Sequence, residues 1–404
     1  MLNTPFSPWP SFTQEEADAV RDIILSNKVN YWTGEQCRQL EQEFADWSEC
    51  RYAVAVNNGT VALDLALRAI DVGAGDEVIV TSRTFLASAS SIVNVGAVPV
   101  FADVSRDSQD ITAESIAAVL TPRTRAIICV HLAGWPCDMD PIMALAGQHG
   151  LKVVEDCAQA HGARYKGRSV GSIGHVAAWS FCQDKIMTTG GEGGMVTTQD
   201  PAVWRRVWAF KDHGKNWDAV YARHHPTGFR WLHESFGTNG RMLEAQAVIG
   251  RIQLHRMPQW HARRVANARR IWATAGRLPG LRVPRLPEGI EHAAYKCYVF
   301  ADASALPPNW GRDRIMAEIN ACGVPCYSGS CSEIYLEKAF DHTGFRPANR
   351  LPNARELGES ALMFLVHPTL TEAEIDKTCG VLEDVMRRCT ATAPNGREQP
   401  MLMA

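Results

Sequence analysis

The sequence predicts an α/β protein with a mostly parallel central sheet that is flanked by helices. Three observations support this fold class. From Tyr52 onwards, short apolar runs alternate with helical segments. The runs are apolar throughout, which is typical of strands that are buried on both faces of a sheet. The chain has 404 residues, 46% of them hydrophobic, which is enough for two or three domains with large cores.

The expected elements follow one another in a regular order. Before about Ser48, two segments with apolar residues at three-and-four spacing predict surface helices, and Thr13 and Glu16 predict a capping box at the first. The expected strands are seven runs: YAVAV, DEVIVTS, VPVFADV, RAIICVHL, LKVVEDC, HVAAWSF and GGMVTT. Helical segments separate most of them, which indicates parallel pairing. In such sheets, ligands bind beyond the carboxyl ends of the strands.

A long helical pattern after the sheet marks the expected domain boundary. It runs from Arg241 to Gly276 and contains Pro258, where we expect a kink or an end of the helix. The sequence therefore predicts N-terminal helices with a large domain at residues 1–257 and a smaller α/β domain at residues 258–389. Residues 390–404 are expected to form a disordered tail.

Charge and cysteine usage argue against several kinds of partner. The 41 basic and 44 acidic residues give a formal net charge of -3, so no basic field favours nucleic acid or an anionic membrane surface. No signal peptide or run of eighteen apolar residues occurs, and we expect a cytoplasmic enzyme without a membrane partner. No metal is expected, because Cys322, Cys326 and Cys331 form the tightest cysteine group and lack a fourth ligand.

Polar groups follow three of the expected strands. Asn57–Thr60 opens a helix, where a glycine lets backbone N–H groups approach a phosphate, although an ordinary capped turn is an alternative. Glu155 and Asp156 end a buried strand, where a carboxylate needs a cofactor ring nitrogen, a salt bridge or a cap as its partner. Lys185 follows the next strand in SFCQDKIMTTGGEGGMVTT. It is either a desolvated nucleophile or an ordinary solvated lysine.

Five segments together resemble the DegT-type nucleotide-sugar aminotransferases, which are pyridoxal phosphate enzymes of fold type I. They are NNGTVALDLALRA, TSRTFLASASSIV, VVEDCAQAHGA, SFCQDKIMTTGGEGGMV and NGRMLEAQAVIGRIQL, and they occur in order between about Pro10 and about Cys389. The resemblance implies the fold type I architecture with a smaller C-terminal α/β domain. It also implies transfer of an amino group from glutamate to a keto-sugar nucleotide. Family prevalence favours a 4-keto-6-deoxy sugar for surface polysaccharide or deoxyaminosugar biosynthesis.

The resemblance also implies the cofactor contacts. Lys185 would form a Schiff base with pyridoxal 5'-phosphate, and Asp156 would pair with the ring nitrogen. The other implied contacts are Gly59, Thr60 and Ser180 at the phosphate, Phe85 on one face of the ring, Gln159 at the phenolic oxygen, and Asn239 at the phosphate of the neighbouring subunit. The contact from Asn239 implies a homodimer with shared active sites.

The substrate residues match the family less closely. His131 and His161 are expected at strand ends near the cofactor. His161 either helps to position the ring or the substrate or is a packed, hydrogen-bonded histidine. Tyr327, Ser330 and Glu333 lie in PCYSGSCSEIYLEKAF, where relatives contact the sugar nucleotide. This stretch departs from the His-Tyr-Pro type segment of many members. The nucleotide, the sugar and the aminated carbon therefore stay open.

Three other functions remain as alternatives. A deoxysugar dehydratase of the same fold has a histidine in place of the Schiff-base lysine, so Lys185 favours the aminotransferase. A noncatalytic cofactor-binding regulator would not need Asp156, Gln159, Ser180 and Lys185 together. A nucleotide-dependent oxidoreductase would need the Gly-x-Gly-x-x-Gly fingerprint, which the sequence lacks.

Overall fold

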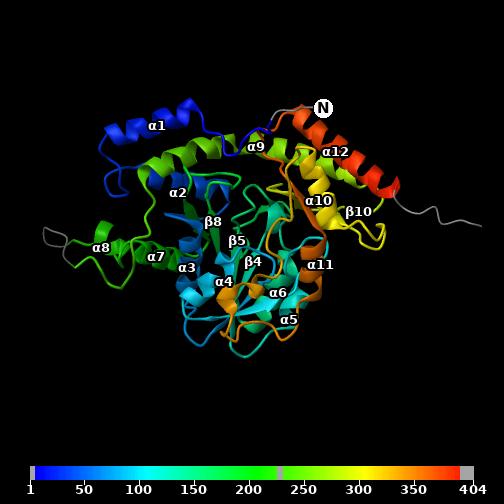
Figure 1. Ribbon diagram of the computed structural model, residues 1–404. Coiled ribbons are helices and arrows are strands. Elements are labelled where there is room, and N and C mark those ends of the chain that lie inside the picture. The colour runs from blue at the N-terminus through cyan, green and yellow to red at the C-terminus, as the bar shows by residue number, and fades with distance from the viewer. Residues whose placement is uncertain (1–4, 225–230, 392–404) are drawn as a thin grey trace, which may run out of the picture.

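The structure is a computed structural model that describes residues 5–224 and 231–391. Its centre is a seven-stranded sheet in the order β1-β9-β8-β5-β4-β2-β3. Figure 1 shows β8, β5 and β4 of this sheet in the middle of the molecule. The seven expected runs form these strands, which confirms the predicted α/β class. The bounds are β1 (Tyr52–Val56), β2 (Glu77–Thr81), β3 (Val98–Ala102), β4 (Thr124–Val130), β5 (Lys152–Asp156), β8 (Val176–Ser180) and β9 (Gly194–Thr198).

The direction of the strands decides where a site can form. Strands β3, β2, β4, β5 and β8 pair in parallel, whereas β9 runs antiparallel to both β8 and β1. Strand β9 is therefore the one reversed strand of this sheet. The carboxyl ends of the other six strands lie along the same edge, where the residues that follow them can meet.

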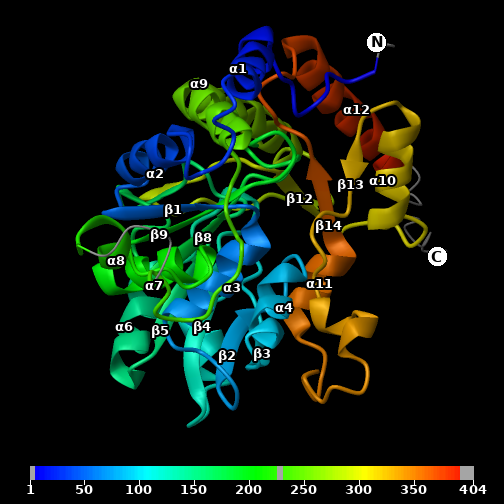
Figure 2. The ribbon, with the colours of Figure 1, turned by 90° about the vertical axis from the view of Figure 1, so that its left-hand side faces the viewer.

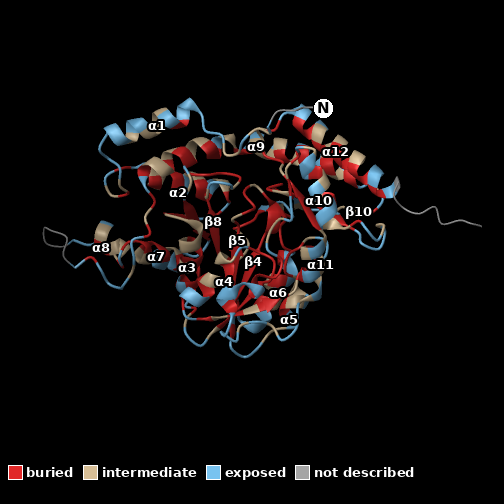
Figure 3. Cartoon of the chain, viewed as in Figure 1, coloured by how far each residue is buried: buried red, intermediate tan, exposed pale blue. Residues whose placement is uncertain are grey.

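Alternating strand residues build a core on each face of the sheet. Val78 and Val80 belong to the core that includes residues of α3, α4 and α7, whereas Ile79 packs into the core that includes α6. The burial of both faces explains why the strand sequences are apolar throughout (Figure 3). The helices are α3 (Gly59–Ala69), α4 (Ala87–Asn94), α5 (Ala113–Ala117), α6 (Met139–His149), α7 (Pro201–Lys211) and α8 (Trp217–Tyr221).

Helix α9 (Glu244–Ala275) has 32 residues and continues through Pro258. Of the two alternatives expected at Pro258, an end of the helix is therefore wrong, and a kink stays a prediction. A proline inside a helix removes one hydrogen bond and costs about 3 kcal/mol or more. Helix α9 packs against α1 (Gln14–Leu25), α2 (Gln36–Trp47) and α12 (Glu372–Ala391), which offsets this cost. The predicted domain division at residues 257 and 258 lies within this helix and stays a prediction.

Helix α1 begins beside the predicted capping box. The backbone N–H of Thr13 donates to the Glu16 carboxylate at 2.7 Å. Glu16 is nevertheless buried, because its carboxylate also accepts hydrogen bonds from Gln253 and Arg256 of α9. The first helix is therefore fixed to the long helix through one carboxylate.

A smaller unit with its own sheet lies beside the large sheet (Figure 2). Its strands pair antiparallel in the order β10-β12-β14-β13 and pack with α10 and α12 in a separate core. The structure thus contains the expected smaller α/β unit. Its elements are β10 (Leu281–Arg282), β12 (Cys297–Ala301), β13 (Cys326–Tyr327), β14 (Ala361–Phe364), α10 (Arg312–Ala321), α11 (Pro352–Ser360) and α12 (Glu372–Ala391).

The expected tail begins two residues too early. Thr390 and Ala391 belong to α12, and the hydroxyl of Thr390 donates to the carbonyl of Met386 at 3.2 Å. Residues 392–404 lie outside the described residues. None of the helices in the described ranges is long and apolar enough to cross a membrane. The short elements are β6 (Arg164–Tyr165), β7 (Arg168–Ser169) and β11 (Ile290–Glu291), which form a small sheet, and η1 (Leu132–Gly134), η2 (Ile334–Leu336) and η3 (Lys338–Phe340).

Candidate active site

A cavity of about 580 Å³ lies at the carboxyl edge of the large sheet. Residues at or just after the ends of β1, β2, β5 and β8 line it. The arrangement follows from the parallel strands, because their ends meet at the same edge. Seven residues that the sequence analysis assigned to the cofactor line this cavity: Gly59, Thr60, Phe85, Asp156, Gln159, Ser180 and Lys185.

The first turn of α3 forms one wall of the cavity. Asn58 caps the helix, because its side chain accepts a hydrogen bond from the backbone N–H of Val61 at 2.9 Å. A Cβ atom at Gly59 would lie 2.6 Å from the Cβ of Ser180, so the close approach of α3 to β8 requires glycine there. The helix start, with the hydroxyls of Thr60 and Ser180, can bind a phosphate.

Asp156 faces the cavity from the end of β5. Its carboxylate is buried and accepts hydrogen bonds from the hydroxyl of Ser88 at 2.8 Å and the backbone N–H of Ala158 at 3.2 Å. Burial raises the pKa of Asp156, whereas these hydrogen bonds and the positive charge of Lys185 act to lower it. A cationic ring nitrogen in the cavity would stabilise the ionised carboxylate, so Asp156 fits the cofactor.

Glu155 is already satisfied by protein groups. One of its oxygens accepts from His131 at 3.0 Å and from the backbone N–H of Gly171 at 2.8 Å. The other accepts from the N–H groups of Ile173 at 2.8 Å and Gly174 at 2.6 Å. Burial acts to raise the pKa of Glu155, but the hydrogen bonds outweigh it and hold the pKa below its usual value. Glu155 is therefore not free to bind a cofactor.

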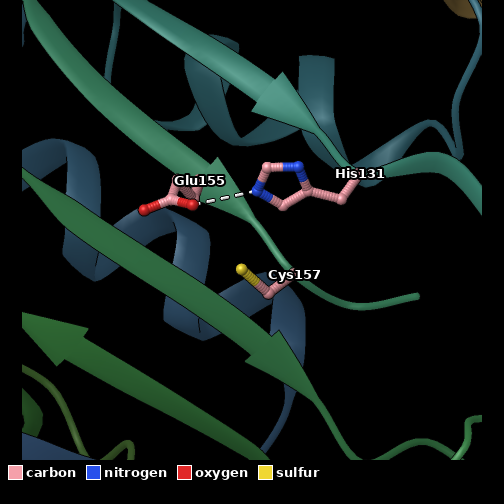
Figure 4. Close-up of side chains that lie close together, drawn as sticks. All are labelled: His131, Glu155 and Cys157. Atoms are coloured by element: carbon pink, nitrogen blue, oxygen red, sulfur yellow. Dashed lines mark hydrogen bonds and ion pairs between the residues drawn. The ribbon is translucent and has the colours of Figure 1, made fainter. Parts of the chain in front are cut away.

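His131, Glu155 and Cys157 form a buried group whose ligand atoms lie within 4.8 Å of one another (Figure 4). The group does not suit a metal ion. Nδ1 of His131 accepts from the backbone N–H of Cys137 at 3.0 Å, so Nε2 carries the proton that is donated to Glu155. Burial raises the pKa of the Cys157 thiol well above its usual value, which opposes the thiolate that a metal needs. His131 therefore positions Glu155 in the core.

Lys185 lies in the loop after β8, and its side chain is 18% exposed. Its amine is 3.3 Å from the carboxylate of Asp184 and 5.4 Å from the centroid of the Tyr295 ring. Its backbone carbonyl accepts a hydrogen bond from the indole of Trp9 at 2.8 Å. The amine thus faces the cavity while an N-terminal residue holds the backbone of the loop.

Gln159 and Phe85 border the same space in complementary ways. The Gln159 carbonyl oxygen accepts from the backbone N–H of Ala133 at 2.9 Å, which leaves its NH₂ group to donate to a ligand oxygen. Phe85 is 72% exposed although it is a large hydrophobic residue. An aromatic ring that is bare at a cavity suits the flat face of a ring-shaped ligand.

A second cavity, of about 570 Å³, adjoins the first. The two share Thr84, Phe85, Gln159, Asp184 and Lys185 as lining residues. The smaller unit contributes the other wall, which includes Tyr295, Lys296, Tyr298 and Ser330. Lys185 therefore faces both spaces, as a residue must if it acts between a cofactor and a substrate.

Of the other expected site residues, Ser330 lines the second cavity, whereas Asn239, His161, Tyr327 and Glu333 lie outside the linings of both cavities. Tyr327 is exposed in β13, and Glu333 forms an ion pair with Arg350 at 2.5 Å. Asn239 is exposed beside Arg241. Its predicted contact with a neighbouring subunit stays a prediction.

His161 packs between aromatic rings. Its ring lies 5.3 Å from that of Trp179 and 5.7 Å from that of Phe181, measured between centroids. Neither ring nitrogen has a hydrogen-bond partner among the described residues. Burial lowers the pKa of His161 to about 3, so the ring is neutral at physiological pH. The ring is packed, but it lacks the hydrogen bond that the packed alternative included, so the substrate role of His161 stays a prediction.

The sequence analysis missed several residues of the site. Ser88 had a signal, because it lies one helical turn after Phe85. Asp184 is adjacent to Lys185 and accepts a short hydrogen bond from the Tyr295 hydroxyl. Tyr295 and Lys296 are more than a hundred residues away in the sequence, and no local pattern places them at this cavity.

Comparisons with known proteins agree with this arrangement. The UDP-N-acetyl-3-dehydro-alpha-D-glucosamine 3-aminotransferase of Acidithiobacillus ferrooxidans is 36% identical over 379 residues, covering 90% of this chain and 94% of that protein. The dTDP-3-amino-3,4,6-trideoxy-alpha-D-glucose transaminase of Streptomyces venezuelae is 34% identical over 359 residues, covering 88% and 89%. The X-ray structure of the aminotransferase from Psychrobacter cryohalolentis has a TM-score of 0.94 and 64% identity, and the match covers 96% of this chain and 100% of that one.

A family model spans almost the whole molecule. It matches residues 10–383, which include the seven strands of the large sheet, the two cavities and most of the smaller unit. The resemblance that the five sequence segments indicated is thus confirmed. The chain belongs to the DegT/DnrJ/EryC1/StrS aminotransferase family.

Proposed function

We propose that this protein is a pyridoxal phosphate-dependent aminotransferase that moves the amino group of glutamate to a keto-sugar nucleotide. The observation that carries the proposal is that Lys185 and Asp156 face one cavity at the carboxyl edge of the sheet. The cofactor, when bound there, withdraws electrons from the carbon that carries the amine. The cavity offers an anion, an amine and a helix start, which are the groups that this cofactor needs.

Each part of the cofactor has a suitable partner. Gly59, Thr60 and Ser180 would hold the phosphate at the start of α3. Asp156 would hold the ring nitrogen, because none of the described residues gives its buried carboxylate a cationic partner at hydrogen-bond distance. Gln159 would donate its amide N–H to the phenolic oxygen.

Lys185 has the role of moving the proton. Its amine lies at the junction of the two cavities, so it can take a proton from the substrate carbon and return one there. Asp184 lies beside the amine and is itself held by the Tyr295 hydroxyl. Asp184 and Tyr295 thereby orient the lysine and leave space in the cavity for the cofactor.

The second cavity is the proposed place of the substrates. It is large enough for a small ligand, and Ser330 from the expected substrate segment lines it. The named relatives act on sugars that carry UDP or dTDP, which supports a nucleotide-sugar substrate. We favour a 4-keto-6-deoxy sugar, used for surface polysaccharide or deoxyaminosugar biosynthesis. The cytoplasmic location stays a prediction.

We further propose a homodimer in which Asn239 contacts the phosphate of the neighbouring subunit's cofactor. Asn239 is exposed and lies outside both cavity linings of its own chain. Both facts are compatible with a contact to another subunit. In a two-fold dimer, each chain would supply the same residue to the other.

The direct test combines the protein with pyridoxal phosphate, glutamate and a panel of 3-keto and 4-keto nucleotide sugars. We expect one keto sugar to gain an amine, which mass spectrometry and proton NMR would identify. The Lys185→Ala variant is the matched control and should give no product. A dehydrated sugar with no added nitrogen would instead support the dehydratase alternative and contradict the proposal.

A further inference from the structure

Lys296 lines the second cavity and forms no ion pair with any of the described residues. It lies just before β12, its side chain is half-buried, and it lines the second cavity but not the first. Among the described residues, its amine forms no hydrogen bond or ion pair, and it lies 4.6 Å from the centroid of the Tyr295 ring. A charged group held in this way is costly unless a ligand compensates it.

The surroundings add to the positive charge. Arg264 is fully buried nearby and has no carboxylate partner among the described residues, and Lys185 contacts the same Tyr295 ring as Lys296 does. The charge of Asp184 acts on Lys296, but this carboxylate is engaged with Lys185 and the Tyr295 hydroxyl. Glu337 also lines the second cavity, but it is exposed to solvent.

The pKa of Lys296 reports the same imbalance. The pKa is lowered to about 8, chiefly by burial; the charge of Asp184 acts to raise it, and the charges of Arg264 and Lys185 act to lower it. A negatively charged group in the cavity would favour the protonated amine.

We propose that Lys296 is an oxyanion-binding residue of the second cavity and takes either a carboxylate of the amino donor or a phosphate of the sugar nucleotide. The inference rests on the proposed function, because that function requires both substrates to reach Lys185. Each substrate carries an oxyanion, and a lysine can bind either as a point charge. Lys296 would then set the position of the substrate and not act on the reacting carbon.

The test measures binding to the cofactor-loaded protein by calorimetry with unreactive probes. Glutarate has the two carboxylates of glutamate without the amine. The nucleotides UDP, dTDP and GDP carry the phosphates. Uridine is an uncharged reference. Lys296→Met removes the charge at nearly constant length. Lys152→Met is the matched control, because Lys152 is exposed at the opposite end of β5. Lys296→Arg tests rescue by another cation.

We expect Lys296→Met to weaken the binding of glutarate or of a nucleoside diphosphate by about tenfold or more. Lys152→Met should leave both within about twofold, and Lys296→Arg should restore most of the loss. Weaker binding of glutarate would show that Lys296 binds the carboxylate of the amino donor. Weaker binding of the diphosphates would show that it binds the phosphate of the sugar nucleotide. Any of three results would overturn the inference. The variant could bind every probe as the unmodified protein does, it could lose uridine binding to the same extent, or the unmodified protein could bind none of the probes.

The measurement separates this inference from the proposed function. Binding of these probes requires no turnover, so a charge-specific loss in Lys296→Met would support the oxyanion site even if no keto sugar were aminated. Conversely, the unmodified protein could aminate a keto sugar while Lys296→Met binds every probe normally. That result would support the proposed function and contradict the role of Lys296 in binding an oxyanion.

Discussion

Glu155 and Asp156 are consecutive residues of β5, but protein groups satisfy the first carboxylate whereas the second faces the cofactor cavity. The difference arises because successive side chains of a strand point to opposite faces. Two adjacent acids therefore have separate tasks, one in the core and one at the site.

Exchanging each carboxylate for its amide should separate these tasks. Asp156→Asn should slow the half-reaction with glutamate on the order of 10²-fold or more, because the ring nitrogen loses its anion. Its free energy of unfolding should change little. Stopped-flow absorbance of the bound cofactor would give the rate, and an unchanged rate would show that Asp156 is not the ring partner.

Glu155→Gln is the matched variant and should show the opposite result. Its amide NH₂ would face backbone N–H donors that now meet a carboxylate oxygen, so the free energy of unfolding should fall by about 1–3 kcal/mol. The rate of the glutamate half-reaction in the remaining folded protein should be retained. Chemical denaturation gives the first quantity. A large rate loss with normal stability would place Glu155 at the cofactor instead.

Lys185 should be the residue that holds the cofactor covalently. Borohydride reduction should fix the cofactor on the peptide that contains Lys185, because this amine faces both cavities. Peptide mass spectrometry identifies the position, and Lys185→Ala should lose turnover. Lys296 is the internal control, since it lies at the second cavity alone; label on Lys296 would contradict the assignment.

The shared site can be tested by mixing two inactive variants. Lys185→Ala and Asn239→Ala should each be strongly impaired, but after subunit exchange a mixed dimer has one site with both changes and one with neither. About half of the normal activity per mixed dimer should return. Native mass spectrometry confirms the exchange. Activity that stays at the sum of the two parents despite exchange would mean that each chain builds its own site.

The buried His161 should make stability sensitive to acid. Its pKa is lowered to about 3 by burial, whereas an unfolded histidine has a pKa of about 6.5, so the unfolded state binds the extra proton between these values. The contribution is present above about pH 6.5 and is lost as the pH falls below it, by up to about 1.4 kcal/mol per pH unit.

Denaturation between pH 4.5 and about 7 measures this effect. His161→Phe removes the titrating ring and keeps an aromatic group among Trp179 and Phe181, so its stability should depend less steeply on pH. His255→Phe is the control, because His255 is exposed on α9. Equal slopes for the unmodified protein and His161→Phe would refute the role of His161.

The strands and the cofactor cavity could be predicted from the sequence because their signals are local. Apolar runs mark the strands, and parallel strand ends must meet, so Asp156 and Ser180 were expected at one edge. Pro258 shows the limit of local reasoning, since packing on three other helices keeps α9 continuous. Tyr295 and Lys296 reach the site only through the placement of the smaller unit, which no pattern in one segment encodes.

The contact of Trp9 with Lys185 links the loop that carries the reactive amine to a distant part of the chain. The residues just before Trp9 are held there too, because the hydroxyl of Ser7 donates to the Glu374 carboxylate at 3.1 Å and the hydroxyl of Thr369 donates to the carbonyl of Pro8 at 2.9 Å. These hydrogen bonds join positions that are 367 and 361 residues apart, and closing a loop of that length costs entropy. A change that loosens the docking of residues 7–9 would therefore also remove a support from the backbone at Lys185.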